Sequence, residues 1–465
     1  MPQKKPREGR RHCIPPAPHP RSQFDLFANL EGALGAALWR ALRDVLLWSE
    51  TRPESRAGLF PPATAAVAER YADAVREAPR LASAFETFAV LRRASESVSP
   101  AEVGLACHRV YAWADSGMWL RVALHFAEAA AYADPDSPAY AVDAGRICRH
   151  ASVDDFPARS AVWYQRAFVL ALRVRNERES IRALTGFGAL MQNLGNDSAA
   201  RMAYLRAARR AKRTGRRRQA ASAYHYLFSL AAETADLETA IPYARKALAL
   251  YPVHDVRLPA LAHDWAFLLI VAGMYRTALA LLERVVRVIE RPDELVHALG
   301  TSARAAGAAG YAARFAAAET TALEMVKHFP EYRPPIVFCL GEGARGCGRW
   351  EDAARYAAEA LTLARQVGNV DLERHAEALV QAVALREPSA PAVEPVGEVA
   401  ALTRRIAARL RRWRRRTRRN LDQGLGRGRA GRQIGVAAAH RQTWPPASRC
   451  FVRTSGRRLR VRCSC

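Results

Sequence analysis

One short pattern recurs about seven times between residues 99 and 366. It is a glycine or other small residue and a bulky residue, followed by alanine, an aromatic residue and a closing Ala-Leu pair at fixed distances. Counted at its first position, the copies fall at residues 117, 155, 195, 235, 273, 309 and 348, so the spacing is 36 to 40 residues. A period of this length indicates an array of supersecondary units rather than an ordinary globular domain.

The chemistry of each copy is helical. Apolar residues recur at positions i, i+3, i+4 and i+7 on both sides of the small residue, which predicts two amphipathic helices joined by a tight turn. Alanine allows two helix backbones to approach closely, and the aromatic residues fill the wedge between neighbouring pairs. One pair cannot bury its own apolar face, so the copies must stack into an all-α solenoid.

These residues resemble the tetratricopeptide repeat (TPR) family. The small residue within its first helix is matched by Gly188 and Gly341, and its closing proline by Pro252. Its turn glycine is matched at positions 117, 195, 273 and 348. The period exceeds the usual 34 residues, several copies lack the closing proline, and the copy around Phe156 lacks the turn glycine. The resemblance implies a right-handed superhelix whose first helices line a concave groove that binds peptides or partner proteins.

The register of that family places seven side chains in the groove. They are Tyr111, Arg149, Arg182, Gln192, His225, Tyr226 and His263. The family members that grip the C-terminal carboxylate of chaperones need lysine and asparagine at set groove positions. This chain has no lysine there and only Asn193 nearby, so we do not expect it to bind chaperone tails.

Composition and prolines divide the rest of the chain. Residues 25–98 read as three helices, either degenerate repeats or a cap for the stack, and 369–386 as a C-terminal capping helix. The remaining segments are expected to be a disordered basic tail at 1–24, a Pro-rich linker at 387–396, a basic amphipathic helix at 397–420 and a disordered Arg-rich tail at 421–465.

The net charge of +26 is confined to the two ends of the chain. Residues 1–24 carry +5 and residues 400–465 carry +19, which leaves +2 for everything between them. Of the 71 basic residues, 66 are arginine, a bias that GC-rich bacterial coding also produces. The charge therefore does not by itself indicate a nucleic-acid-binding protein.

The segment 397–420 combines an apolar stripe with dense positive charge. The stripe is Val399, Leu402, Ile406, Leu410 and Trp413; the basic positions beside it, with Trp413, are Arg404, Arg405, Arg409, Arg411, Arg412, Arg414, Arg415 and Arg416. Such a helix could bind nucleic acid or lie on an anionic membrane. It could also be a solvated tail without function, or a product of gene-end misassignment.

A second basic run carries eight positive groups in 13 residues without an acid. Its members are Arg206, Arg209, Arg210, Lys212, Arg213, Arg216, Arg217 and Arg218. It falls at the end of a second helix and in the following loop, where an acidic partner could dock. A solvated loop is the plainer interpretation.

No residue pattern predicts catalysis. Phosphate-binding loops, His-Glu-x2-His and Gly-x-Ser-x-Gly are missing, and the spaced glycines Gly341, Gly343 and Gly346 follow a helix rather than a strand. His225 and His263 occupy equivalent positions in neighbouring copies, but a metal needs a third ligand, and Asp264 is expected to point elsewhere. We expect no enzyme activity, no metal and no cofactor.

The sequence therefore predicts a protein-binding scaffold or regulatory adaptor in the cytoplasm. The partner would be a protein or peptide held in the groove. The alternative is a nucleic-acid or anionic-surface binder that uses the Arg-rich end, with the solenoid recruiting something else. A sensor that compacts on binding a signalling peptide is a third possibility. The longest apolar run, 265–274, is too short to span a membrane.

Overall fold

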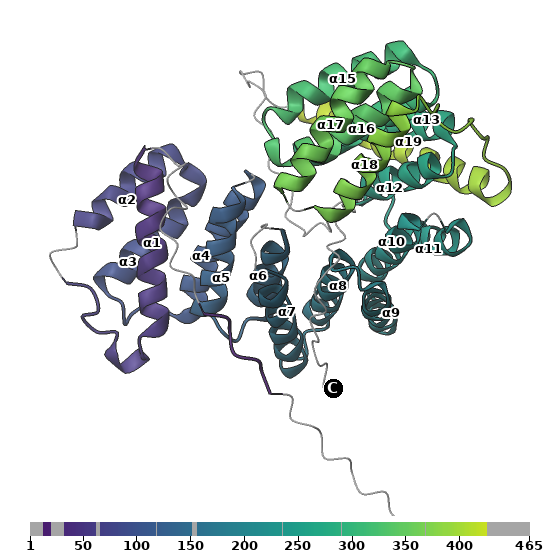
Figure 1. Cartoon of the computed structure of the whole chain (residues 1–465). Coiled ribbons are helices and arrows are strands. Elements are labelled where there is room, and N and C mark those ends of the chain that lie inside the picture. Colours follow the sequence, from purple (N-terminus) through teal and green to yellow (C-terminus); the bar gives the residue numbers. More distant parts are fainter. Residues whose placement is uncertain are drawn as a thin grey trace, which may run out of the picture. The chain divides into compact units, whose positions relative to one another are not determined.

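The structure is a computed structural model, and all regular secondary structure in the residues that it describes is helical (Figure 1). Those residues are 13–19, 32–61, 66–117, 119–150, 156–234, 236–289, 291–367 and 369–425. The prediction of an all-α chain of helix–turn–helix pairs is confirmed. The contacts divide it into two compact units, Met1–Leu190 and Met191–Cys465, so a boundary falls inside the predicted array.

Unit 1 begins with three helices and continues with helix pairs. The helices are α1 (Gly32–Glu50), α2 (Ala66–Glu77), α3 (Ala82–Arg93), α4 (Pro100–Ser116), α5 (Leu120–Ala133), α6 (Pro138–His150), α7 (Phe156–Arg173) and most of α8 (Glu177–Asn193). The start of α4 is fixed by a capping box, in which Ser99 and Glu102 bond each other's backbone N–H groups. Helices α1 and α3 pack on α5 and α4, so the N-terminal helices cover the first pair.

Unit 2 holds the remaining pairs. Its helices are α9 (Asp197–Arg213), α10 (Arg217–Glu233), α11 (Leu237–Leu250), α12 (Leu258–Val271), α13 (Tyr275–Val285), α14 (Pro292–Ala308), α15 (Ala312–Val326), α16 (Arg333–Gly346), α17 (Trp350–Gln366), α18 (Val370–Ala384) and α19 (Gly397–Leu425). The turns between partners of a pair fall where the repeat pattern predicts them. Gly273 and Gly348 there adopt φ values of +78° and +70°, a conformation that disfavours side chains.

The spaced glycines of α16 serve helix packing. A methyl group on Gly307 of α14 would lie 2.0 Å from the carbonyl oxygen of Gly343, and one on Gly346 would lie 2.5 Å from Gly307. The backbones of α14 and α16 therefore touch, and only glycine fits at the crossing. Close helix packing therefore accounts for the spaced glycines, which would otherwise suggest a nucleotide-binding loop.

Two terminal segments differ from the expectation. Residues 13–19, part of the tail expected to be disordered, lie extended against α5 and α7, and residues 421–425 continue α19. The remainder of both predicted disordered tails lies outside the described residues. No helix of the described chain is both long and apolar enough to cross a membrane.

Candidate functional site

A row of polar side chains links the first helices of unit 1. His108 Nε2 of α4 lies 3.2 Å from Asp143 Oδ2 of α6, and Arg182 Nη2 of α8 donates to Asp143 Oδ1 at 2.6 Å. Arg182 also donates to Glu179 at 2.6 Å. We call His108, Asp143, Arg182 and Glu179 the unit 1 ladder. Burial alone would raise the pKa of Asp143, but Arg182 and His108 outweigh it and hold that pKa well below its usual range.

The other predicted groove residues of unit 1 are also held by neighbours. Tyr111 is 4% exposed, and its hydroxyl accepts a hydrogen bond from Arg146 Nε at 3.1 Å. Arg149 is half-buried and interacts with the Tyr164 hydroxyl. The groove positions implied by the TPR resemblance are therefore occupied here by side chains that connect successive first helices. Tyr111 and Arg182 join neighbouring repeats, and little of either side chain is exposed.

The matching row in unit 2 is built on histidines. His225 Nε2 of α10 lies 2.9 Å from Asp264 Oδ2 of α12, and His263 Nδ1 lies 3.4 Å from Asp264 Oδ1. His263 Nε2 continues to Thr301 Oγ1 of α14 at 3.1 Å. We call these four residues the unit 2 ladder. Burial would raise the pKa of Asp264, but hydrogen bonds from His225 and His263 reverse the effect and hold it well below its usual range.

The expectation that Asp264 points away from both histidines is wrong. Because α12 lies between α10 and α14, residues about 100° apart on it each reach a neighbouring helix, His263 towards α14 and Asp264 towards α10. Within the described residues, no group of three His, Cys, Asp or Glu side chains is arranged to hold a metal ion. The geometry instead makes the row a buried hydrogen-bond chain.

Gln192 and Tyr226 lie at the surface near α9. Gln192 accepts from the Tyr204 hydroxyl at 2.8 Å and donates to Glu233 at 2.6 Å. The half-buried ring of Tyr226 stacks on Tyr204 with centroids 5.0 Å apart. These two predicted groove residues therefore keep partly accessible surface while their orientation is fixed by neighbours.

The basic run lies where the sequence predicts it, at the end of α9 and the start of α10. Arg218 is neutralised by the buried Asp255, with Nε and Oδ2 2.8 Å apart, and Arg210 and Arg216 are half-buried. Five side chains project into solvent and have no ion-pair partner in the described part of the chain: Arg206, Arg209, Lys212, Arg213 and Arg217. We call these five the basic turn.

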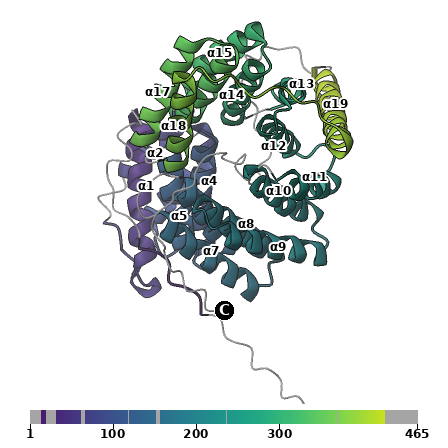
Figure 2. The same ribbon diagram turned by 45° about the vertical axis from the view of Figure 1, so that its right-hand side comes forward.

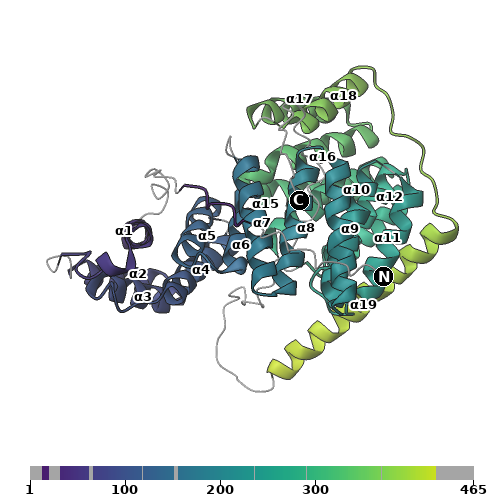
Figure 3. The ribbon, with the colours of Figure 1, turned by 90° about the horizontal axis from the view of Figure 1, so that it is seen from below.

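Helix α19 packs against α11, α12 and α13 of its own unit (Figures 2 and 3). Its whole apolar stripe is buried, from Val399 at 9% exposure to Ile406 at 0%. Trp265 Nε1 of α12 donates to Thr403 Oγ1 at 2.8 Å, and the preceding linker is bound through the Val393 N–H to the Gly273 carbonyl at 2.9 Å. The stripe is therefore part of the core, which argues against a helix that lies with this face on a membrane.

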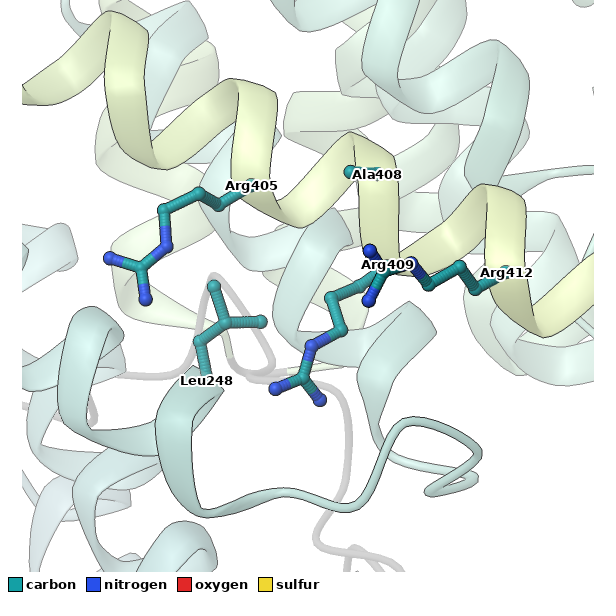
Figure 4. Close-up of a pocket in the computed structure, with 5 residues that line it drawn as sticks. All are labelled: Leu248, Arg405, Ala408, Arg409 and Arg412. Carbon is teal, nitrogen blue, oxygen red and sulfur yellow. The ribbon is translucent and has the colours of Figure 1, made fainter.

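The opposite face of α19 keeps its charge. Arg404, Arg405, Arg411 and Arg412 are exposed, whereas Arg409 is half-buried and donates to the Tyr251 carbonyl at 3.0 Å. A small recess between α11 and α19 is lined by Leu248, Arg405, Ala408, Arg409 and Arg412 (Figure 4). Burial, then the positive charges of Arg412 and Arg405, lower the pKa of Arg409. The side chains of Arg414, Arg415 and Arg416 lie outside the described residues.

Buried charged clusters of unit 1 were missed by sequence reasoning, and the one on α5 and α7 contacts the N-terminal segment through Tyr132. Glu128 of α5 is 2% exposed and accepts from Arg159 Nη2 at 2.7 Å and from Trp163 Nε1 at 2.8 Å. Arg159 also donates to the Tyr132 hydroxyl at 2.9 Å. The available signal was a carboxylate on the apolar face of α5, which requires a buried partner.

No known family profile matches the chain, and no curated protein shows significant similarity to it. Among solved structures, a Rap protein complexed with competence and sporulation factor is similar with 11% sequence identity and a TM-score of 0.34. The match covers 84% of this chain and 99% of that chain. A likeness with so low a TM-score does not bear on the fold, which the helices and turns of the chain itself define.

Proposed function

We propose that the chain is a non-enzymatic scaffold or regulatory adaptor of the TPR kind. The repeat spacing, the glycines in the turns and the small residues at helix crossings support the TPR assignment. Its partner is a protein or peptide with an acidic segment, which docks at the basic turn.

The five uncompensated cations of the basic turn carry this proposal. Their mutual repulsion is relieved when carboxylates of a partner approach, and a single-sign patch accelerates association with an oppositely charged surface. The half-buried ring of Tyr226 on α10 is held by stacking on the buried Tyr204 of α9, and it offers rigid apolar area in the same unit. The ladders keep consecutive first helices in register, so this surface is preformed.

The test compares charge reversals in the full chain. The triple variant Arg209→Glu, Lys212→Glu and Arg213→Glu is matched by Arg52→Glu, Arg80→Glu and Arg287→Glu, three exposed arginines elsewhere. Proteins captured from nuclease-treated host lysate by the unaltered chain are quantified by mass spectrometry. We expect a stoichiometric partner whose capture falls about tenfold in the first variant and is unchanged in the control, the size expected for several rim charges. Equal capture by both variants contradicts the docking surface.

The second candidate is nucleic-acid binding through α19, favoured by its exposed arginine face. Four arginines of one helix side have no described carboxylate partner, and the recess beside Arg405 and Arg409 could take a phosphate. The variant Arg404→Gln, Arg405→Gln, Arg411→Gln and Arg412→Gln would then bind a generic RNA more weakly, with a shallower dependence on salt. Retention that nuclease abolishes would favour this candidate over the scaffold.

A further inference from the structure

A proline-rich stretch of the chain is bound to unit 1. Residues 13–19 read Cys-Ile-Pro-Pro-Ala-Pro-His. Ile14, Pro15, Ala17 and Pro18 are partly buried, while Cys13, Pro16 and His19 are exposed, so one side of the segment faces the helices. Three of the seven residues are proline and four precede a proline, and both conditions favour the extended polyproline II conformation.

Two side chains of unit 1 donate hydrogen bonds to backbone carbonyl groups of this segment. Arg166 Nη1 of α7 donates to the Pro15 carbonyl at 2.9 Å, and the Tyr132 hydroxyl of α5 donates to the Pro18 carbonyl at 2.6 Å. A polyproline II helix has three residues per turn, so carbonyls three residues apart point to the same side. Proline lacks an N–H group, so a site for such a segment must supply donors. Tyr132 and Arg166 meet both conditions.

The tyrosine donor is oriented by the buried cluster beneath it. Arg159, fixed by Glu128, donates to the Tyr132 oxygen, and because a guanidinium can only donate, the phenol's own hydrogen is left for an acceptor outside the cluster. Trp163 Nε1 donates to the same Glu128 and its ring lies 5.6 Å from that of Tyr132. Burial and the Glu128 charge raise the pKa of Tyr132, so the phenol keeps its proton.

The arginine donor is positioned from the other side. Arg166 Nη2 donates to the Pro135 carbonyl at 2.8 Å, so one guanidinium bridges the α5–α6 connection and the bound segment. These contacts recognise backbone carbonyls and the spacing of a polyproline II turn, and they use no side-chain polar group of the segment. Any chain segment of the form x-Pro-Pro-x-Pro presents the same acceptors.

We propose that this face of α5 and α7, defined by Tyr132 and Arg166 and called the proline site, binds proline-rich segments of partner proteins. Residues 14–18 are an internal ligand that occupies the site until a partner displaces them. The internal segment is tethered through residues 20–31 to α1, and a short tether gives an effective concentration on the order of millimolar. A partner therefore needs either higher affinity or several contacts at once. The site is separate from the basic turn, and its test does not depend on that surface.

The test uses the full chain with its internal ligand disabled. In the exchanged chain, Ile14→Gly, Pro15→Ser, Pro16→Gly and Pro18→Ser remove the polyproline II preference without touching a helix. The probe is a fluorescent peptide with the sequence of residues 11–21 and Cys13→Ser, and binding is followed by fluorescence anisotropy. We expect saturable binding to the exchanged chain and at least tenfold weaker binding to the unaltered chain, where the segment competes in cis.

Two substitutions and a control locate the binding. In the exchanged chain, Tyr132→Phe and Arg166→Met each remove one donor and should weaken peptide binding about three- to tenfold, the usual size of one hydrogen bond. Tyr224→Phe, a half-buried tyrosine of unit 2, should change nothing. A peptide with alanine for every proline keeps the carbonyls but loses the preformed conformation, and it should bind at least tenfold more weakly.

Three results would overturn the proposal. They are a folded exchanged chain that does not bind the peptide, binding that is indifferent to both donor substitutions, and equal binding of the alanine peptide. Circular dichroism establishes that each variant is folded. If the exchanged chain aggregates, Pro18→Gly alone provides the second background, in which peptide binding should again exceed that of the unaltered chain.

Discussion

The two ladders solve one problem with different chemistry. Each joins three successive first helices through a buried aspartate, Asp143 in unit 1 and Asp264 in unit 2, and in each the carboxylate pKa is depressed. In unit 1 the main partner is Arg182, whose guanidinium cannot lose its proton. In unit 2 the partners are His225 and His263, and an imidazole can donate a hydrogen bond without carrying a charge. A ladder built on the permanent charge of arginine is therefore less tolerant of losing its carboxylate than one built on imidazole hydrogen bonds.

The largest effect is expected for Asp143→Asn. The substitution leaves the buried Arg182 with Glu179 as its remaining carboxylate and deprives His108 of its partner. Because the guanidinium stays charged, we expect the free energy of unfolding to fall by about 3 kcal/mol, the lower end for a broken buried ion pair. Urea unfolding measures the loss, and hydrogen exchange should locate it in α4, α6 and α8. The exposed substitution Asp73→Asn, expected to cost under about 0.5 kcal/mol, is the control.

Asp264→Asn should be milder, at about 1–2 kcal/mol. A neutral imidazole leaves no buried charge without a partner, and each histidine retains a second neighbour, the Tyr251 hydroxyl for His225 and Thr301 for His263. The same urea titration, with hydrogen exchange read in α10, α12 and α14, compares the two ladders directly. A loss larger than that of Asp143→Asn would refute the distinction between the guanidinium partner of unit 1 and the imidazole partners of unit 2.

Lowering the pH should reduce the loss of unfolding free energy that each aspartate substitution causes. A carboxylate whose folded pKa lies below its unfolded value stabilises the fold fully above the ordinary aspartate pKa, about 4, and loses that contribution as pH falls through the folded pKa. The gap in unfolding free energy between the unaltered chain and Asp264→Asn should therefore shrink below about pH 4. Unfolding titrations at about pH 5 and pH 3 test this. A gap that widens at the lower pH would show that the sign is wrong.

The smallest effect is expected at the end of the unit 2 ladder. Thr301→Val keeps the shape of the side chain and removes the hydroxyl that contacts His263 Nε2, so we expect a loss of about 1 kcal/mol. In the double variant Thr301→Val with Asp264→Asn, the loss of unfolding free energy should differ from the sum of the two single losses, because His263 contacts both groups. Strict additivity in the double-mutant cycle would mean that the four residues do not act as one chain.

The sequence predicted the helices well because periodicity and turn glycines are local signals. The turns at Gly273 and Gly348 and the capping helix at 370–384 lie where expected. It could not tell whether the polar residues of the first helices also join repeats or only line a groove, since that depends on which helix faces each side chain. The spacing of Tyr111, His225 and His263 is the same under either arrangement.

The docking of α19 left a trace that can be recognised afterwards. The apolar run 265–274 makes α12 hydrophobic on nearly all sides, which is typical of a helix surrounded by others. A two-helix repeat leaves one side of its first helix in the groove, so an extra covering element was required. The sequence identified the apolar stripe of α19, but not the helix on which it packs. The contact between Trp265 of α12 and Thr403 of α19 joins residues 138 apart, and no local pattern identifies such a pair.

The return of α19 also sets an order of events during synthesis. A repeat array ordinarily consolidates from neighbour to neighbour as the chain emerges. Here α12 is complete at Val271, yet Thr403 of α19, which accepts a hydrogen bond from Trp265 of α12, is made on the order of ten seconds later at ordinary translation rates. The packing around α12 in unit 2 is therefore completed only after α19 has been synthesised. A nascent or C-terminally nicked molecule presents an apolar face there, which chaperones or proteases can recognise.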